Sequence, residues 1–433
     1  MTINYTIIPE KQKAWHFKLL QYFTKQPSNV VREYISHYSS KGDTVLDPFS
    51  GTGVTGIEAL SLKRKIVLFD LSPLACFISK ETVRSPIDIQ ELNDTFKKLA
   101  GEMRESVEFV NSASKKKIED YEITDWFPKK IRLPKNSDFD FVEDLFDKKQ
   151  LIIFSKLLSK IKKIKDESIK NQFLLIFSNT LGKVNLTYMD NKIRGPEGGG
   201  SSIFGKYRYW RPKTKAVLDV WKNFENRYKY LFKARLISNN EIGKFFSESN
   251  FKIINDSATH ISKYLKEHSI DYIYTDPPYG AHIAYLDLAT MWHAWLNYKI
   301  SDEIKNLEII ENGDVKHNRE HYLDMLYKSA LEMYKVLKPE KYLSLVFQHK
   351  DTNLWFKVLD CFRDVGFFPE NMVHQPTKTT SMHKKANPLN VFGDQIIVNF
   401  QKPKRKIQIL VHNREDMDIL YLIINAAKKE IFN

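Results

Sequence analysis

The sequence predicts an α/β protein in which a doubly wound, largely parallel sheet is interrupted by a mainly helical insert. Three observations lead to this expectation. An apolar run ends at Asp47 and is followed at once by a glycine-rich turn and a helix, as at the start of such sheets. Further apolar runs also end at acidic residues, namely Asp70, Asp256 and Asp276. Between Asp70 and Asp256, residues 84–250 show no alternation of strands and helices.

The first part of the sheet is expected at the start of the chain. Hydrophobic spacing predicts helices over 27–40 and 54–62, and short buried strands over 44–46 and 66–69. Ser72 and Pro73 then begin another helix, because proline fits the first helical turn. This strand–turn–helix–strand–helix order predicts parallel strands joined by helical crossovers.

The alternation returns near Phe251, after an insert that contains one long helical stretch at 147–183 and a glycine-rich loop at 190–206. We expect strands over 252–254, 272–275, 342–347 and 395–400, and helices over 259–267, 286–297 and 320–337. The predicted organisation is a first part of the catalytic domain over 1–83, an insert over 84–250, a second part over 251–403, and a C-terminal extension over 404–433.

Composition and charge narrow the class of protein. The chain has 433 residues and 42% hydrophobic residues, which is typical of a folded globular protein. Its 67 Lys and Arg residues against 53 Asp and Glu residues give a formal net charge of +14. This excess suits a polyanionic partner such as nucleic acid, although a lysine-rich proteome also produces basic proteins.

The cysteines indicate a reducing compartment. Cys76 and Cys361 are far apart and lie in apolar surroundings, which predicts buried thiols. The sequence has no metal-ligand spacing, so no metal is expected. It shows neither a signal-peptide core nor a run of about 18 apolar residues, and we therefore expect a cytoplasmic protein without a membrane partner.

The glycine-rich turn predicts a cofactor site, because such a turn lets a ligand approach the backbone closely. Asp47 at the strand end repels phosphate but suits the ammonium of a methionyl group. A carboxylate at Asp70 can accept hydrogen bonds from ribose hydroxyls, and Asp256 is placed to accept from an adenine amino group. A nicotinamide or flavin enzyme is the competing interpretation, since Gly56 completes a GxGxxG pattern, but Asp47 argues against it. The predicted cofactor-binding residues are Asp47, Pro48, Phe49, Ser50, Gly51, Thr52, Gly53, Asp70, Leu71, Asp256 and Ser257.

The sequence Asp276-Pro277-Pro278-Tyr279, which follows a predicted strand, suggests chemistry on an exocyclic amine. Such an amine is a poor nucleophile because its lone pair is delocalised into the ring. The Asp276 carboxylate and the Pro277 carbonyl can each accept one N–H and direct the lone pair at a methyl donor. The Tyr279 ring offers a stacking surface for a base, which must leave the duplex to be reached. A rigid turn with a cap is the plain structural alternative.

Both motifs resemble those of the amino-group DNA methyltransferases, the adenine-N6 and cytosine-N4 enzymes. The resemblance covers residues 24–83 and 251–403. It implies a Rossmann-like methyltransferase sheet, S-adenosylmethionine as cofactor, and catalytic residues Asp276, Pro277, Pro278 and Tyr279. Thr24, Lys25 and Pro27 correspond to a family segment that touches the methionine part of the cofactor.

The order of cofactor motif, insert and DPPY resembles the alpha class of this family, and it implies that the insert recognises the target sequence. DPPY favours adenine N6 in double-stranded DNA, as in restriction-modification enzymes, whereas SPPY is commoner for cytosine N4. Three alternatives stay open. They are cytosine-N4 methylation, RNA guanine-N2 methylation, because Gly280 gives the DPPYG found in such enzymes, and an inactive nucleic-acid-binding relative. A separate restriction or defence-system subunit also stays open.

Two segments are candidates for contact with nucleic acid. Residues 206–211 interleave cations with aromatic rings, which suits phosphate contact and base stacking. The alternative there is a strand with inward-packed aromatics. Residues 375–385 are polar and basic, as a solvated loop also is. The candidate residues are Lys206, Tyr207, Arg208, Tyr209, Arg211, Lys378, Lys384 and Lys385.

Overall fold

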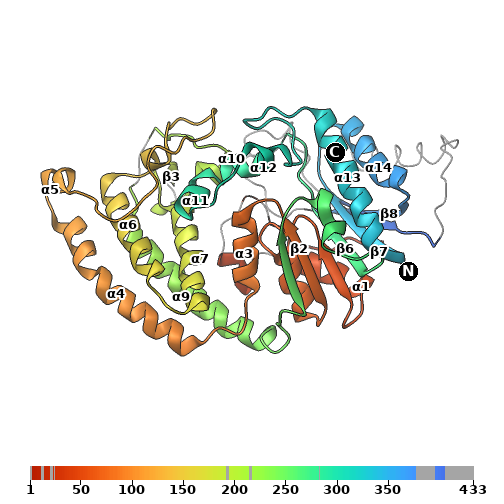
Figure 1. Cartoon of the computed structure of the whole chain (residues 1–433), viewed down its shortest axis with the longest axis horizontal. Coiled ribbons are helices and arrows are strands. Elements are labelled where there is room, and N and C mark those ends of the chain that lie inside the picture. The colour runs from red at the N-terminus through yellow and green to blue at the C-terminus, as the bar shows by residue number, and fades with distance from the viewer. Residues whose placement is uncertain are drawn as a thin grey trace.

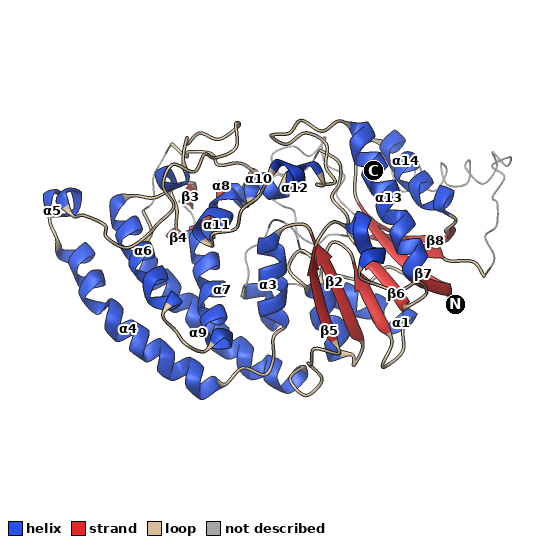
Figure 2. Cartoon of the chain, in the orientation of Figure 1, coloured by secondary structure: helices blue, strands red, loops and turns tan. Residues whose placement is uncertain are grey.

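A seven-stranded sheet forms the centre of one half of the molecule (Figures 1 and 2). The computed structural model describes residues 2–10, 14–19, 23, 25–191, 195–213, 217–281, 283–376 and 395–404. The strand order is β5-β2-β1-β6-β7-β9-β8, and β9 runs antiparallel to both of its neighbours while the pairs from β5 to β7 are parallel. The predicted doubly wound, Rossmann-like fold class is therefore confirmed. The strands are β1 (Thr44–Asp47), β2 (Lys65–Asp70), β5 (Phe251–Asn255), β6 (Ile270–Thr275), β7 (Leu337–Phe347), β8 (Phe368–Gln375) and β9 (Gln395–Gln401).

Helices cover both faces of this sheet. Successive side chains of each strand point to opposite faces, so apolar residues on both faces must be buried. Val45 points into a core shared with α1 (Ser28–Tyr38) and α2 (Val54–Ser61). The next residue, Leu46, points into the opposite core. The helices of that second face are η3 (Ala258–Lys263), α13 (Arg319–Val336) and α14 (Thr352–Val365). Parallel strands buried on both faces need such crossovers, as the apolar runs predicted.

The insert forms a helical lobe beside the sheet, seen at the left of Figure 1. The helical stretch predicted over 147–183 is two helices, because Asp166 begins the second by accepting a hydrogen bond from Ile169 N at 2.8 Å. The helix α3 (Pro73–Val83) packs between this lobe and the sheet. The elements of the lobe are α4 (Ile89–Ser112), α5 (Lys115–Asp120), η2 (Val142–Leu145), α6 (Lys148–Lys162), α7 (Glu167–Lys183), the hairpin of β3 (Tyr188–Asn191) and β4 (Gly195–Ser201), α8 (Ser202–Gly205) and α9 (Val220–Glu241), with η1 (Trp15–Lys18) packed on α9.

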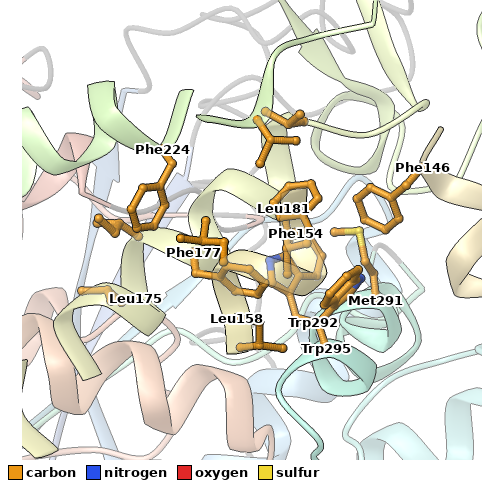
Figure 3. Packing of buried hydrophobic residues seen from close by; sticks show 14 of the residues in the cluster. Phe146, Phe154, Leu158, Leu175, Phe177, Leu181, Phe224, Met291, Trp292 and Trp295 are labelled. Carbon is orange, nitrogen blue, oxygen red and sulfur yellow. The ribbon is translucent and has the colours of Figure 1, made fainter. Parts of the chain in front are cut away.

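The segment that follows DPPY packs into this lobe. A single helix was expected over 286–297, but the chain forms α10 (Tyr285–Leu288) and α11 (Thr290–Trp295), followed by α12 (Asp302–Asn306). Trp292 and Trp295 lie among the phenylalanines and leucines of α6 and α7 (Figure 3). Trp292 Nε1 also donates to the Ser178 carbonyl at 2.7 Å. The core of the lobe is thus completed by residues distant in sequence, and 84–250 does not bury its apolar side chains alone.

Both cysteines are buried free thiols. Burial raises the pKa of Cys76, and it raises the pKa of Cys361 to about 12, so both are protonated near neutral pH. Within the described ranges, no helix combines the length and the apolar character that crossing a bilayer requires. Of the predicted C-terminal extension over 404–433, only Lys404 is among the described residues.

Candidate active site

A cavity of about 940 Å³, counting the part open to solvent, lies where strands β1, β2 and β6 end. The strand order explains why these three ends meet. β1 lies between β2 and β6, and the three strands run parallel, so their carboxyl ends lie at one edge of the sheet. The residues lining the cavity come from the ends of these strands, from the segment before α1 and from the segments after β5 and β6. They include Lys25, Gln26, Asp47–Thr52, Val54, Thr55, Asp70–Ser72, Ser257, Ala258, Tyr274, Asp276, Pro278, Tyr285, Leu286 and Leu307–Ile309.

Asp47 brings a desolvated carboxyl to the end of β1. Its side chain is 5% exposed, and Oδ1 accepts a hydrogen bond from Phe49 N at 3.0 Å. Burial raises the pKa of Asp47 to about 7, against the opposing hydrogen bond from Thr55. A cationic group in the cavity would restore the ionised form, because an opposite charge favours the carboxylate.

The glycine-rich turn has a backbone that only glycine adopts readily. Gly53 has φ +76° at the start of α2, and a Cβ there would lie 3.0 Å from Ser79 Cβ on α3. The Ser79 hydroxyl donates to the Gly51 carbonyl at 3.0 Å. Gly51 N in turn donates to Asp70 Oδ2 at 2.9 Å, so the turn is fixed to both α3 and the end of β2.

Asp70 is held by backbone amides. Oδ1 accepts from Ser72 N at 2.9 Å, and Oδ2 accepts from Gly51 N. Burial raises the pKa of Asp70 to about 6 despite these two hydrogen bonds. Each carboxylate oxygen has a second lone pair, so the side chain is oriented and still able to accept from a diol.

Asp276, at the end of β6, is oriented by two side chains. Gln26 Nε2 donates to Oδ2 at 2.7 Å, and the Tyr279 hydroxyl donates to Oδ1. Burial raises the pKa of Asp276 to about 6, and these hydrogen bonds oppose the shift. The carboxyl is therefore ionised in most molecules at pH 7, the form that accepts hydrogen bonds from an amine.

The rest of the DPPY segment is held in place by contacts with β7, β9 and α13. The Tyr279 ring packs edge to face on Phe347, with 5.2 Å between ring centroids, and its hydroxyl accepts from Gln395 Nε2 at 3.2 Å. The Pro278 carbonyl accepts from the Tyr322 hydroxyl at 2.8 Å. These contacts fix the segment before any substrate is bound, which is the preorganisation that electrostatic catalysis requires.

Gly280 has a conformational reason to be glycine. Its φ is +62°, and a Cβ at this position would lie 3.1 Å from Glu311 Oε1. Glu311 N also donates to the Gly280 carbonyl at 3.1 Å. The glycine of DPPYG therefore serves the turn, whichever nucleic acid is the substrate.

The cavity suits a ligand that carries an ammonium, a diol and an apolar ring. The carboxyls at the ends of β1 and β2 are those of the buried Asp47 and the half-buried Asp70, and Phe49, Leu71 and Ala258 supply apolar wall. Within the described part of the chain, Gln26 Oε1 and Ser50 Oγ are buried without hydrogen-bond partners. Such atoms are costly unless a ligand or water satisfies them, and S-adenosylmethionine offers matching groups. No group of three or more His, Cys, Asp or Glu side chains in that part could hold a metal ion.

The structure brings most of the predicted site residues together. Those lining the cavity are Asp47, Pro48, Phe49, Ser50, Gly51, Thr52, Asp70, Leu71, Ser257, Asp276 and Pro278. Lys25 lines it too, whereas Thr24 lies outside the described residues. Gly53, Pro277 and Tyr279 adjoin this lining without forming part of it.

Asp256 differs from its expected placement. Its Oδ1 lies 2.8 Å from His260 Nδ1, and its Oδ2 accepts from the Tyr264 hydroxyl at 2.8 Å. Asp256 does not line the cavity, although the next residue, Ser257, does. The structure therefore does not place Asp256 in the cavity lining, and its expected contact with an adenine amino group stays a prediction.

Sequence reasoning missed several lining residues, including Gln26, Tyr285, Leu286 and Glu308. Glu308 is the one with a detectable signal, since it is a single acid inside the apolar run Leu307–Ile310. The others carry no pattern of their own and reach the cavity only through folding.

The segment expected to stack on bases follows α8 as a loop, and its central aromatic residue faces inward. Tyr209 is 1% exposed, its hydroxyl donates to the Leu288 carbonyl at 2.6 Å, and it accepts from Met291 N at 3.1 Å. The expectation that Tyr209 contacts nucleic acid is corrected, because its ring is buried in the core of the lobe. Tyr207 is half-buried.

The cations of the same loop lie at the surface. Lys206, Arg208 and Arg211 are exposed, with Lys206 Nζ 3.4 Å from the centroid of the Trp210 ring. Arg208 forms an ion pair with Asp138. Lys378, Lys384 and Lys385, also expected to contact nucleic acid, lie outside the described residues.

The sequence of this chain is similar to those of known proteins. A family model described as DNA methylase matches residues 6–81 and 270–430. The Type II methyltransferase M.MjaII of Methanocaldococcus jannaschii is 24% identical over 423 residues, covering 83% of this chain and 76% of the relative. The Type II methyltransferase M.MvaI of Kocuria varians is 24% identical over 327 residues, covering 74% of this chain and 64% of the relative, so the match spans less than two thirds of that protein. The solved structure of TrmN from Thermus thermophilus is 9% identical with a TM-score of 0.30, over 87% of this chain and 49% of TrmN, a likeness too weak to carry an argument.

Proposed function

Because this chain belongs to the DNA methylase family, we propose that it transfers a methyl group from S-adenosylmethionine to the N6 amino group of adenine in double-stranded DNA. The chain is a DNA methyltransferase, and S-adenosylmethionine is the methyl donor. The adenine specificity, the individual residues and the recognition by the insert are our proposals. The observation that carries the assignment of the cofactor and catalytic residues is that the Asp276 carboxyl and the acids ending β1 and β2 share one cavity. The DPPY sequence supports adenine as the target.

The residues at the ends of β1 and β2 are proposed to hold the cofactor. The Asp47 carboxylate pairs with the methionyl ammonium, and Asp70 accepts from the ribose hydroxyls. Phe49 and Leu71 contact the apolar ring. S-adenosylmethionine supplies an electrophilic methyl group on its sulfonium. Nothing more is required of it, because the remaining chemistry is the activation of an amine by the chain's own groups.

Asp276 is proposed to activate the amine. Its carboxylate accepts one N–H of the target amine, and the Pro277 carbonyl accepts the other, which localises the nitrogen lone pair. Gln26 and Tyr279 hold the carboxylate in position through their hydrogen bonds to it. The base must leave the duplex to reach this depth, and Tyr279 offers it a ring surface.

The insert is proposed to recognise the target sequence. It stands beside the sheet (Figure 1) and presents the exposed cations Lys206, Arg208 and Arg211. Such cations contact phosphates and set the register of the protein on DNA, while other groups read the bases. The segment after DPPY packs into the same lobe, so the groups that read DNA and those that hold the target base share a core.

Methyl transfer to nucleic acid tests this proposal. Purified enzyme is incubated with tritiated S-adenosylmethionine and with either mixed-sequence duplex DNA from an unmethylated host or total RNA, and labelled nucleosides are identified by mass spectrometry. We expect N6-methyladenine in DNA. Asp276→Asn should lower the rate by about 10²–10³-fold, the typical cost of removing one preorganised polar group. Asp324→Asn, which changes an exposed acid on α13, is the matched control.

Each other outcome has a clear meaning. Label found in RNA alone would refute the DNA proposal. N4-methylcytosine in DNA would replace adenine by cytosine as the target. Equal rates for wild type and Asp276→Asn would remove Asp276 from the catalytic residues.

A further inference from the structure

Glu308 is a buried acid in the wall of the active-site cavity, outside both sequence motifs. It lies in the segment between α12 and α13, its side chain is 6% exposed, and its neighbours Leu307 and Ile309 also line the cavity. A carboxyl in so apolar a setting is costly to bury, and unpaired acids of this kind gather at functional sites.

The surroundings of Glu308 provide backbone hydrogen-bond donors for it, but no cation among the described residues forms an ion pair with it. Oε1 accepts a hydrogen bond from Leu286 N at 3.0 Å, and the backbone N–H of Tyr285 also donates a hydrogen bond to the carboxyl. The nearby ammonium of Lys305 pairs with Asp287 Oδ1 at 3.1 Å instead. Within the described residues no side chain forms an ion pair or a hydrogen bond with the Glu308 carboxyl.

Burial raises the pKa of Glu308 to about 8, with the Asp287 charge adding to the shift and the Leu286 and Tyr285 amides and Lys305 opposing it. At pH 7 the side chain is therefore mostly the neutral acid. A neutral carboxyl accepts with one oxygen and donates with the other. Its acceptor is used by the backbone of α10, which leaves the O–H as a donor.

The position of Glu308 assigns it to the target base. The cofactor residues end β1 and β2, whereas the wall containing Glu308, Tyr285 and Leu286 comes from the chain that follows β6 and Asp276. In Figure 1 this chain, at α10 and α12, lies between the helical lobe and the sheet. Both groups that face the base would thus be supplied by the same stretch of chain.

We propose that Glu308 is a specificity-determining residue that donates a hydrogen bond to the ring nitrogen next to the target amine. This inference rests on the proposed function and deepens it. Adenine presents an acceptor, N1, beside its N6 amine, and cytosine presents N3 beside N4. Guanine presents an N–H, N1, on the Watson–Crick side of its N2 amine, which a donor rejects, while its acceptor N3 lies on the other side of that amine. Asp276 would accept a hydrogen bond from the amine, and Glu308 would donate one to the neighbouring ring nitrogen. Together they would select a base that carries an amine next to a hydrogen-bond acceptor.

The competing explanation is structural. As a carboxylate, Glu308 would simply cap the amides that begin α10. The two explanations predict opposite effects of pH. A donor loses function as the acid ionises above pH 8, whereas a cap accepts better when it is ionised.

Other titratable groups could also shape a pH profile. Asp287 on α10 and Lys305 on α12 act on the Glu308 carboxyl directly. Asp47, Asp276, Lys25 and Tyr285 share the cavity, and His321 on α13 lies 3.2 Å from the Glu308 carbonyl. The profile of wild type must therefore be compared with that of a variant at position 308.

The experiment compares wild type, Glu308→Gln and Glu308→Leu on duplex DNA between pH 6.5 and pH 9.5. We expect kcat/KM of wild type to fall about tenfold per pH unit above pH 8 through Glu308. Glu308→Gln, whose amide both accepts and donates at every pH, should lack this decline and should exceed Glu308→Leu by about 10-fold or more at pH 7. Identical profiles for wild type and Glu308→Gln, or a rate that rises with pH only in wild type, would overturn the proposal.

A modified base tests the same contact in the wild-type protein, so the result does not depend on a variant that folds. Target DNA carrying 1-deazaadenine replaces the N1 acceptor by C–H. We expect a loss on the order of 10- to 100-fold in kcat/KM for wild type, and a much smaller loss for Glu308→Leu, because coupled groups show non-additive effects. Equal losses in both proteins would refute the contact. Absence of methylation of ordinary DNA would instead refute the proposed function itself.

Discussion

The Tyr209 hydroxyl links the basic loop of the insert to the segment that follows DPPY, and its removal gives a measurable prediction. In Tyr209→Phe the ring remains, but the Leu288 carbonyl loses a donor at 2.6 Å and Met291 N loses an acceptor at 3.1 Å. Both groups lie at the junction of α10 and α11 in the core of the lobe.

The magnitude follows from counting the groups left without this partner. A buried polar group that loses its hydrogen bond costs about 1–3 kcal/mol. Two such groups predict a fall of about 2–6 kcal/mol in the free energy of unfolding. Urea denaturation followed by circular dichroism measures it, with Tyr327→Phe on α13, a tyrosine that is 38% exposed, as the matched control.

A loss below about 0.5 kcal/mol for Tyr209→Phe, similar to that of an ordinary surface change, would refute the reasoning. The same result would reopen the possibility that Tyr209 is available to nucleic acid.

Three further predictions concern the cavity. Since the Asp276 carboxylate must accept from the amine and its pKa is about 6, single-turnover methyl transfer should fall about tenfold per pH unit below pH 6; an unchanged rate at pH 5 would contradict this. Since the Asp47 pKa is about 7 and its ionised form is proposed to bind the ammonium, the calorimetric Kd for S-adenosylmethionine should rise as the pH falls below 7, and Asp47→Asn should abolish that dependence. Gly53→Ala should destabilise the fold by about 1–2 kcal/mol through its φ of +76°, with a further cost from the contact with Ser79; a neutral effect in a thermal melt would show that the turn relaxes.

Much of the candidate site could be predicted from local sequence. Asp47, Asp70 and Asp276 each end an apolar run, and the ends of parallel strands meet at one edge of a sheet. The glycine pattern after Asp47 marked a close approach to the backbone, and Gly53 has the left-handed φ that such a turn requires. These features are local because each depends on one strand end and the turn that follows it.

Other parts of the site depend on partners distant in sequence. The acid Asp256 has the same local pattern as Asp70, yet it contacts His260 and Tyr264 and does not line the cavity. The aromatic–cationic pattern at 206–211 was compatible with both a buried and an exposed ring, and the core of the lobe placed Tyr209 inside.

The sequence by itself determined that a doubly wound sheet would carry a cofactor turn and an amine-directed DPPY segment at one edge. Only the tertiary structure decided that Trp292 and Trp295 complete the core of the insert, and that Glu308 lines the cavity without an ion-pair partner among the described residues. The physical reason is that strand ends are arranged by local hydrogen bonding and handedness. Burial and electrostatic environment, in contrast, are set by whichever distant side chains fill the remaining space.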